Sequence, residues 1–444
     1  MSSARELALL SLLKFEREQS YSNFVLNSAL KQNELSSKDS AFFSVLFYGT
    51  IEQKLTLDYI ISKNIKTKIS KLSPHVKNIL RLSVYQLLFM DKIPPSAVVN
   101  EAIKLAKKLK QAYSSGFINA VLRKISTHTF EDYLPLKEEK VLYFSIKYSC
   151  PEELVEFFIK NYKEQCEDIL RSFLENKKTY LRVNTLKTTA DNLIDILSKE
   201  NIKCEKHEFI ENAIFTSKSA GLTQTKAFTD GLFHIQDISS QLCCHFIYPK
   251  EGEKIADVCA SPGGKSFTIA QLMNNEGSVD SFDIIDGRVN MIKEGADRLS
   301  INCICAGKRD AAKDQKNEKL YDAVLCDVPC SGLGVIGKKP EIKYKSLDLI
   351  KMLPDLQYEI LCNSSKLLKP GGRLIYSTCT LNPYENEEVL KKFLKNHKEF
   401  VSYLPNIVYN VKDSKNVDKN GYITLLPFKY DCDGFFIGGI KKMG

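Results

Sequence analysis

The sequence predicts a multidomain protein: an all-helical N-terminal domain, a small α+β unit, and an α/β domain with a mostly parallel sheet. Its 444 residues exceed what one ordinary hydrophobic core accommodates. Apolar residues recur at helical spacing up to about residue 124, and short apolar strands alternate with helices after residue 230. Residues 1–150 hold 22 of the 63 Lys and Arg but 13 of the 54 Asp and Glu, so this first third carries the whole net charge of +9.

The helical domain is expected over residues 1–128. Val98 and Ala102 lie on one face of a predicted helix that carries Lys104 and Lys107 elsewhere, and a second helix begins at Gly116. The excess positive charge indicates that this domain binds a polyanion. The alternative is that lysine-rich helices only keep the protein in solution. The net charge alone does not distinguish polyanion binding from this solubility role.

The composition is that of a globular protein that stays in the cytoplasm. No run approaches the roughly 18 apolar residues of a membrane span. The first helix is amphipathic, with charges such as Arg5 and Glu16, and does not resemble a secretory signal. The 13 cysteines form no CxxC pair and there are six histidines, so we expect reduced, mostly buried thiols and no metal site.

Beyond a polar linker at 129–140, two further regions are expected. Residues 141–230 form the α+β unit, with a helical stretch near 151–176 and a strand that begins at Tyr180. Residues 231–444 form the α/β domain, with helices near 265–273, 286–299, 347–368 and 384–396. Its predicted strands are Lys254–Val258, Ser278–Phe282, Asn302–Ala306, Tyr321–Cys326 and Arg373–Thr378.

Polar residues and glycines gather where these strands end. Because the carboxyl ends of parallel strands meet at one edge, where ligands bind, we expect these residues to line one cleft. They are the turn from Asp257 to Lys265, then Asp283, Asp310, the segment Asp327–Cys330, and Cys379.

The first of these turns predicts a ligand close to the backbone. We expect Gly263 and Gly264 to adopt conformations that a side chain would forbid, with the N-terminus of the next helix facing a carboxylate or phosphate. The absence of GxGxxG and GxxxxGK[ST] disfavours dinucleotide and P-loop sites. Asp283 follows about 20 residues later and is placed to accept ribose hydroxyls. The alternative is that it caps the helix that begins near Asp286.

Two thiols and a carboxyl group suggest the chemistry. Cys330 follows Asp327 by three residues, and Cys379 ends the neighbouring strand. A thiolate that adds to C6 of cytosine makes C5 nucleophilic toward a methyl sulfonium, and a carboxyl group can stabilise N3. The alternative is that both cysteines are small buried filler, which two cysteines on adjacent loops make less attractive.

The motifs resemble two known families. Ala97-Val-Val-Asn-Glu-Ala-Ile-Lys-Leu-Ala-Lys and Gly116-Phe-Ile-Asn-Ala-Val-Leu-Arg-Lys resemble the RNA-binding helical domain of the NusB antitermination family. Nearly the whole chain resembles the 16S ribosomal RNA cytosine-C5 methyltransferase B family. The motifs behind this resemblance are Arg182-Val-Asn-Thr-Leu-Lys, Gln236-Asp237, Cys259–Lys265, Asp283 with Arg288, Asp327–Cys330, Lys369-Pro-Gly-Gly, Ser377-Thr-Cys379 and Asp433-Gly-Phe-Phe436.

The resemblance implies a NusB-like domain before a Rossmann-like methyltransferase domain that uses S-adenosylmethionine. It makes Cys379 the nucleophile, Cys330 the group that promotes loss of the C5 proton and release of the enzyme, and Asp327 the contact to N3; Lys265 would orient the base or Asp327. The partner would be structured RNA, with the protein a monomer that binds no membrane. The implied cofactor residues are Cys259, Ala260, Ser261, Pro262, Gly263, Gly264, Lys265, Asp283, Arg288, Asp310 and Asp327.

Some positions depart from the family pattern. Ser261 and Val328 replace alanines of the pattern, and Asp310 follows Lys308-Arg309 where glycine is common, which puts its adenine contact in doubt.

Two rival functions stay open. The substrate could be transfer RNA or another ribosomal site, because cleft motifs recognise cytosine and not its context. The chain could also be a non-catalytic RNA-binding or antitermination factor, although the retained cysteines argue against a relic.

Overall fold

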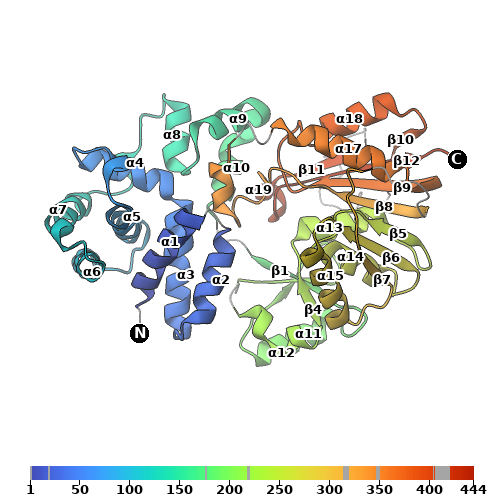
Figure 1. Ribbon diagram of the computed structural model, residues 1–444, viewed down its shortest axis with the longest axis horizontal. Helices are drawn as coiled ribbons and strands as arrows, with labels where there is room; N and C mark the ends of the chain where they lie inside the picture. Colours follow the sequence, from blue (N-terminus) through green and yellow to red (C-terminus); the bar gives the residue numbers. More distant parts are fainter. Residues whose placement is uncertain are drawn as a thin grey trace. The chain divides into compact units, whose positions relative to one another are not determined.

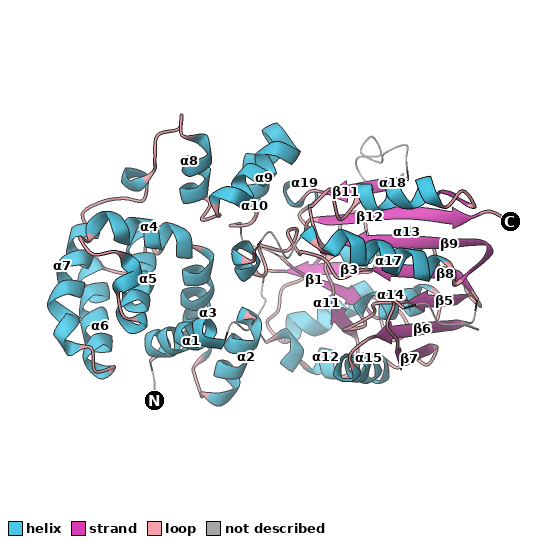
Figure 2. Cartoon of the chain, turned by 45° about the horizontal axis from the view of Figure 1, so that its top comes forward, coloured by secondary structure: helices cyan, strands magenta, loops and turns pink. Residues whose placement is uncertain are grey.

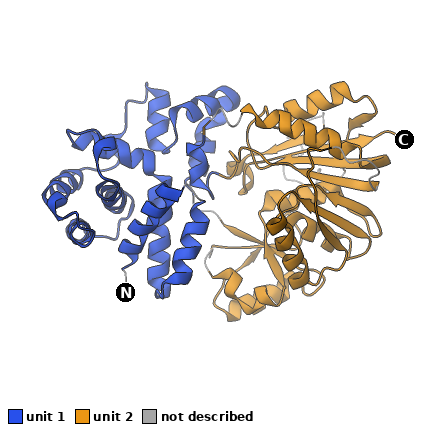
Figure 3. Cartoon of the chain, in the orientation of Figure 1, with its two compact units in different colours: residues 1–175, 336–345 blue, residues 176–335, 346–444 orange. Residues whose placement is uncertain are grey.

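The computed structural model describes residues 3–18, 21–175, 178–217, 221–313, 320–346, 351–403, 405 and 421–444. The chain forms two compact units, drawn in different colours in Figure 3. Unit 1 contains residues 1–175 and 336–345, and unit 2 contains residues 176–335 and 346–444. In the described part of the chain, no helix has both the length and the apolar character that a membrane crossing requires.

Unit 1 is all-helical, as predicted (Figure 1). Its first buried cluster joins the helices up to residue 125, and Val99, Ala102 and Ala106 enter it from the face that the sequence predicted. Serine side chains cap two of the helices, and prolines occupy the first position of α5 and α6. The α-helices are α1 Ala4–Glu18, α2 Ser22–Gln32, α3 Ser37–Glu52, α4 Lys54–Asn64, α5 Pro74–Phe89, α6 Pro95–Lys108, α7 Ser115–Ile125, α8 Lys140–Lys147, α9 Glu152–Tyr162 and α10 Cys166–Ser172.

Two segments extend unit 1 beyond its predicted end. Phe130, in the predicted linker, packs against Phe89 in a tilted arrangement, with 5.1 Å between the ring centroids. Residues 141–175, predicted to belong to the α+β unit, pack within unit 1, where Thr56 Oγ1 donates to the Ile146 carbonyl at 2.6 Å. The other segment is the distant 3₁₀ helix η6 Pro340–Tyr344, from which Lys343 Nζ donates a hydrogen bond to a carbonyl of α3 at 2.8 Å. Pairings between distant segments, invisible in a local pattern, therefore decide where this unit ends.

Unit 2 begins with a small antiparallel sheet in the order β2-β3-β1-β4. This sheet and its helices form the predicted α+β unit. Asn184, just after β1, donates to the carbonyls of Gly231 and Leu299, so the small sheet is fixed to the larger domain. The elements are β1 Thr179–Val183, α11 Ala190–Lys199, β2 Glu205–Lys206, β3 Ala213–Thr216, α12 Lys226–Thr229 and β4 Phe233–Ile235.

The larger sheet has eight strands in the order β10-β12-β9-β8-β5-β6-β7, with β11 paired to β12. Strands β5 to β9 are mutually parallel, as predicted, and the C-terminal strands add an antiparallel edge that the sequence analysis did not anticipate. The strands are β5 Lys254–Asp257, β6 Ser278–Asp283, β7 Ile304–Lys308, β8 Tyr321–Asp327, β9 Leu368–Thr378, β10 Phe400–Ser402, β11 Tyr422–Leu425 and β12 Phe435–Lys442.

Helices cover both faces of this sheet (Figure 2). The alternation of side chains along β8 shows why, because Ala323 and Leu325 enter one buried cluster while Val324 and Cys326 enter the other. One face packs against α13 Ile238–Ile247, α14 Gly264–Leu272 and α15 Asp286–Leu299, and the other packs against α17 Leu353–Ser365 and α18 Glu387–Asn396. Of the helix predicted near 347–368, residues 347–350 lie outside the described residues.

Candidate active site

The predicted site residues follow the carboxyl ends of neighbouring strands. β5 pairs in parallel with β6 on one side and with β8 on the other, so the strand order reverses at β5. This is the position where open α/β sheets bind ligands. The glycine turn follows β5, Asp327 ends β8, and Cys379 comes directly after β9.

The turn after β5 has the form needed to bring a ligand close to backbone N–H groups. Gly263 has φ +108°, and a Cβ there would overlap the ring of Phe267, so no side chain fits. Gly264 differs from our expectation, because it starts α14 with ordinary helical geometry and a Cβ would meet only the Gln236 amide at 3.7 Å. The N-terminus of α14 has no side-chain cap. Its N–H groups therefore suit an external carboxylate or phosphate.

Two acidic residues lie beside this turn. The Asp283 side chain is buried, and its Oδ1 accepts a hydrogen bond from the Ile285 N–H at 3.0 Å. That bond stabilises the turn before α15, whereas Arg288 lies 3.9 Å from the same oxygen. Asp310 is adjacent, because the N–H of its neighbour Arg309 donates to the Asp283 carbonyl at 3.1 Å. Both predicted carboxylates therefore lie at the same edge of the sheet.

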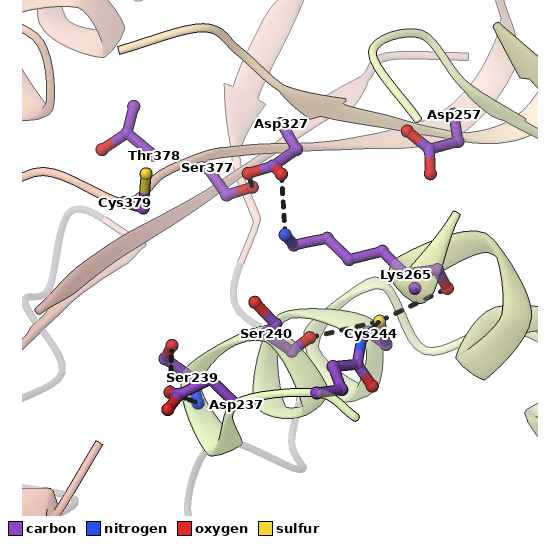
Figure 4. A network of polar contacts seen from close by, with 12 residues as sticks. Asp237, Ser239, Ser240, Cys244, Asp257, Lys265, Asp327, Ser377, Thr378 and Cys379 are labelled. Carbon is purple, nitrogen blue, oxygen red and sulfur yellow. Dashed lines mark hydrogen bonds and ion pairs between the residues drawn. The ribbon is translucent and has the colours of Figure 1, made fainter. Parts of the chain in front are cut away.

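Asp327 receives a hydrogen bond at each carboxylate oxygen (Figure 4). Lys265 Nζ donates to Oδ2 at 2.7 Å, and Ser377 Oγ donates to Oδ1 at 2.7 Å. Burial disfavours the charge on Lys265, but the neighbouring Asp327 carboxylate outweighs it and raises the Lys265 pKa. Ser377 is fully buried, and its motif in the sequence predicted no separate role for it. Asp327 is thus fixed between the Lys265 ammonium group and the Ser377 hydroxyl.

The two predicted catalytic thiols are neighbours. The sulfur atoms of Cys330 and Cys379 lie 3.2 Å apart, and both residues are partly accessible. The hydrogen bond with Cys379, together with burial, raises the pKa of the Cys330 thiol well above its usual range. The two thiols therefore share a hydrogen bond in which either sulfur can be the donor.

Backbone contacts hold the loops that carry the thiols. The Gly334 N–H donates to the Cys379 carbonyl at 3.0 Å, and the Gly434 N–H donates to the Gly334 carbonyl at 2.8 Å. A Cβ on Gly334 would overlap the backbone of Gly434, so this crossing requires glycine. Asp237 Oδ1 accepts the Asp433 N–H at 3.0 Å, which connects two further predicted motifs.

A second carboxylate, Asp257, lies deeper at the end of β5. Its side chain is buried, and burial raises its pKa to about 7. Ser266 Oγ donates to Oδ2 at 2.7 Å, which favours the charged form but does not outweigh burial. The sequence pattern places Asp257 at the end of a strand but predicts no role for it. An acidic residue directly before the glycine turn was the available signal, but its burial came from the fold.

Two other observations concern the location of the site and its capacity to hold a metal ion. A cavity of about 320 Å³ is lined by residues such as Glu253, Asp322 and Arg373, near the beginnings of β5, β8 and β9. It therefore lies at the opposite edge of the sheet and contains none of the predicted site residues. Among the residues that the structure describes, no cluster of three His, Cys, Asp or Glu could hold a metal ion.

Comparison with known proteins identifies the parts of the chain. Family models match it as NusB over residues 2–127, as the ferredoxin-like domain of RsmF/B-like methyltransferases over 150–222, and as 16S rRNA methyltransferase RsmB/F over 244–441. The probable ribosomal RNA small subunit methyltransferase B of Bacillus subtilis is 38% identical, over 100% of this chain and 99% of the relative. That of Synechocystis is 33% identical, over 100% of both chains.

A solved structure agrees with these matches. The methyltransferase homolog protein from Pyrococcus horikoshii is 26% identical, with a TM-score of 0.58 over 68% of this chain and 99% of that one. The resemblance to the methyltransferase B family and to NusB is therefore confirmed. The chain belongs to the RsmB/F family of 16S rRNA methyltransferases.

Proposed function

We propose that this protein methylates C5 of a specific cytosine in 16S ribosomal RNA through a covalent bond between Cys379 and C6. The observation that carries this proposal is the pair of sulfur atoms, 3.2 Å apart, of Cys330 and Cys379. Asp327 lies at the adjacent strand end and is held by Lys265 and Ser377. A non-catalytic RNA-binding protein would have no use for this set of groups. Transfer RNA, or another site in ribosomal RNA, is the alternative substrate.

The residues around the glycine turn fit S-adenosylmethionine, which supplies an activated methyl group on a sulfonium. The N-terminus of α14 after Gly263 would face its carboxylate, and Asp283 would accept ribose hydroxyls. Arg288 and Asp310 flank Asp283, and we place Cys259, Ala260, Ser261, Pro262, Gly264, Lys265 and Asp327 around the same ligand.

The reaction begins at Cys379. With the pair's proton held by Cys330, the Cys379 thiolate forms a bond to C6 of the cytosine, and the electron pair of the C5–C6 double bond shifts toward N3. N3 takes up a proton, which the Asp327 carboxylate accepts as a hydrogen bond, and Lys265 keeps that carboxylate in place. C5 is then nucleophilic toward the methyl group that a bound sulfonium donor would supply, with the carbon–sulfur bond of that donor as the bond that would break.

Release depends on Cys330. Once Cys379 is bonded to carbon, its charge and its hydrogen bond no longer hold the proton on Cys330, so this thiol loses its proton to water. The Cys330 thiolate then takes the hydrogen from C5, the C5–C6 double bond re-forms, and the bond from C6 to Cys379 breaks. N3 loses its proton, so each turnover releases one proton.

The helical domain, residues 1–128, would capture the RNA together with the α+β unit, and we place the protein in the cytoplasm as a monomer. Capture through phosphates fits the basic charge of this region. The target cytosine would leave its stack to enter the cleft, which costs a few kcal/mol, and less in a loop.

The decisive experiment substitutes each thiol. Cys379→Ala should form neither adduct nor product, whereas Cys330→Ala should accumulate covalent protein–RNA complex. Cys362→Ala, a partly accessible thiol on α17, is the matched control and should behave as wild type. Near-normal turnover of Cys379→Ala would refute the mechanism. Bisulfite mapping of methylated 16S and transfer RNA fragments decides the substrate, and RNA binding without any methyl transfer would favour a non-catalytic factor.

A further inference from the structure

A fully buried carboxylate lies behind the two thiols and has no part in the mechanism above. Glu385, in the turn between β9 and α18, accepts hydrogen bonds from the Ser331 N–H at 2.8 Å, Gln357 Nε2 at 2.9 Å and Asn382 Nδ2 at 2.8 Å. Within the described ranges, no Lys or Arg forms an ion pair with Glu385. Three N–H donors suit an ionised carboxylate. The hydrogen-bond partners of this buried side chain are therefore neutral N–H groups.

Hydrogen bonds connect this carboxylate to the residues on both sides of Cys330, directly to one and through Gln357 to the other. Ser331, whose N–H it accepts, directly follows Cys330. Gln357, whose amide also binds Glu385, donates to the carbonyl of Pro329, directly before Cys330, at 3.0 Å. The position of the Cys330 sulfur thus depends on Glu385.

The same turn holds the loop of Cys379. Asn386 Nδ2 donates to the Thr380 carbonyl at 3.0 Å, and the Ser331 and Thr380 hydroxyl oxygens lie 2.6 Å apart. Asn386 Oδ1 also accepts a hydrogen bond from Thr378 Oγ1. The residues on both sides of Cys379 are therefore tied to the turn that carries the carboxylate.

We propose that Glu385 is a positioning residue that assigns different roles to the two thiols, by holding the Cys330 loop against Cys379 and placing a negative charge beside Cys330. This inference rests on the proposed function. Among the described residues, Asp327, which Lys265 binds, and the titratable Tyr376 also interact with Cys330. The negative charges of Glu385 and Asp327 add to the hydrogen bond with Cys379 and to burial in raising the Cys330 pKa. The proton stays on Cys330, and Cys379 attacks.

The test replaces only the charge. Glu385→Gln keeps the size of the side chain and an oxygen acceptor for the Ser331 N–H. The full-length protein, without RNA, is treated with iodoacetamide from pH 6 to 10, and labelling of Cys330 and Cys379 is quantified by mass spectrometry. We expect the rate ratio of Cys330 to Cys379 to rise about tenfold, because removing a nearby like charge lowers the Cys330 pKa and increases its thiolate fraction.

The matched control is Glu388→Gln, which makes the same substitution at an exposed residue three positions away and should leave the ratio unchanged. Glu385→Gln also sets the new amide against Asn382 Nδ2, a conflict that could impair folding. The double variant Glu385→Gln/Asn382→Ser removes the opposing amide without adding a charge and should still raise the ratio several-fold. A wild-type ratio and pH profile in a folded variant would overturn the proposal and leave Glu385 a purely structural role.

A separate measurement identifies a failure of the proposed function itself. RNA that contains 5-fluorocytosine traps the adduct, because fluorine cannot leave C5 as a proton does. Wild-type protein should yield peptide adducts at Cys379 alone, and Glu385→Gln should yield a measurable share at Cys330. If wild-type protein forms no adduct, the proposed function fails, whereas the labelling ratio, measured without RNA, still reports on Glu385. Adducts at Cys379 alone in both proteins would contradict the assignment of roles by Glu385.

Discussion

Replacing Asp257 with asparagine should change how the stability of unit 2 depends on pH. The side chain is 1% exposed, and burial raises its pKa from 3.8 to about 7. Because the folded pKa lies above the unfolded value, the native state binds the extra proton between these two pH values. Stability contributed by the protonated form is therefore present at low pH and is lost as pH rises toward 7.

The magnitude follows from the shift. Each pH unit within the window is worth about 1.4 kcal/mol, so from pH 5 to pH 8 wild-type protein should lose about 3 kcal/mol that Asp257→Asn does not lose. The asparagine variant, compared with wild type, should therefore gain about 3 kcal/mol of relative stability over this range. The neighbouring Ser266→Ala variant should extend this loss of stability to higher pH, because Ser266 donates a hydrogen bond that favours the charged form of Asp257.

The assay must report on unit 2 alone, because a protein with two compact units need not unfold in one step. Hydrogen exchange of β5 and β8 peptides across a urea series gives the local free energy of unfolding at each pH. A difference between Asp257→Asn and wild type that stays constant from pH 5 to pH 8 would show that burial does not hold a proton on Asp257.

Three further predictions concern other parts of the chain. Arg81→Met should destabilise unit 1 by about 3–5 kcal/mol in thermal unfolding, because two carboxylates lose their shared, largely buried partner; an unchanged midpoint would contradict this. Gly334→Ala should lower methyl transfer about 100-fold while cofactor binding persists, since its Cβ would displace the thiol loop from Gly434; normal turnover would refute it. Lys104→Gln and Lys107→Gln should each reduce the slope of log affinity for RNA against log salt by about one, and unchanged slopes would exclude this helix from phosphate binding.

Local sequence patterns predicted the helices and most parallel strands well. The helix predicted at 286–299 is α15 Asp286–Leu299, and the five predicted strands correspond to β5 to β9 within a few residues. These elements depend on the spacing of apolar residues, which is visible in any short window. The antiparallel strands β10 to β12 were not predicted, because they depend on pairing between distant segments.

For the candidate site too, some features were predictable from the sequence and others only from the structure. The sequence by itself determined the residue types at the strand ends, including Asp327, Cys330 and Cys379, because a parallel sheet brings all of its carboxyl ends to one edge. Only the tertiary structure decided that the two sulfurs touch and that Glu385 and Asp257 are buried beside the site. Burial and proton affinity arise from groups brought together by packing, and no short stretch of sequence contains that information.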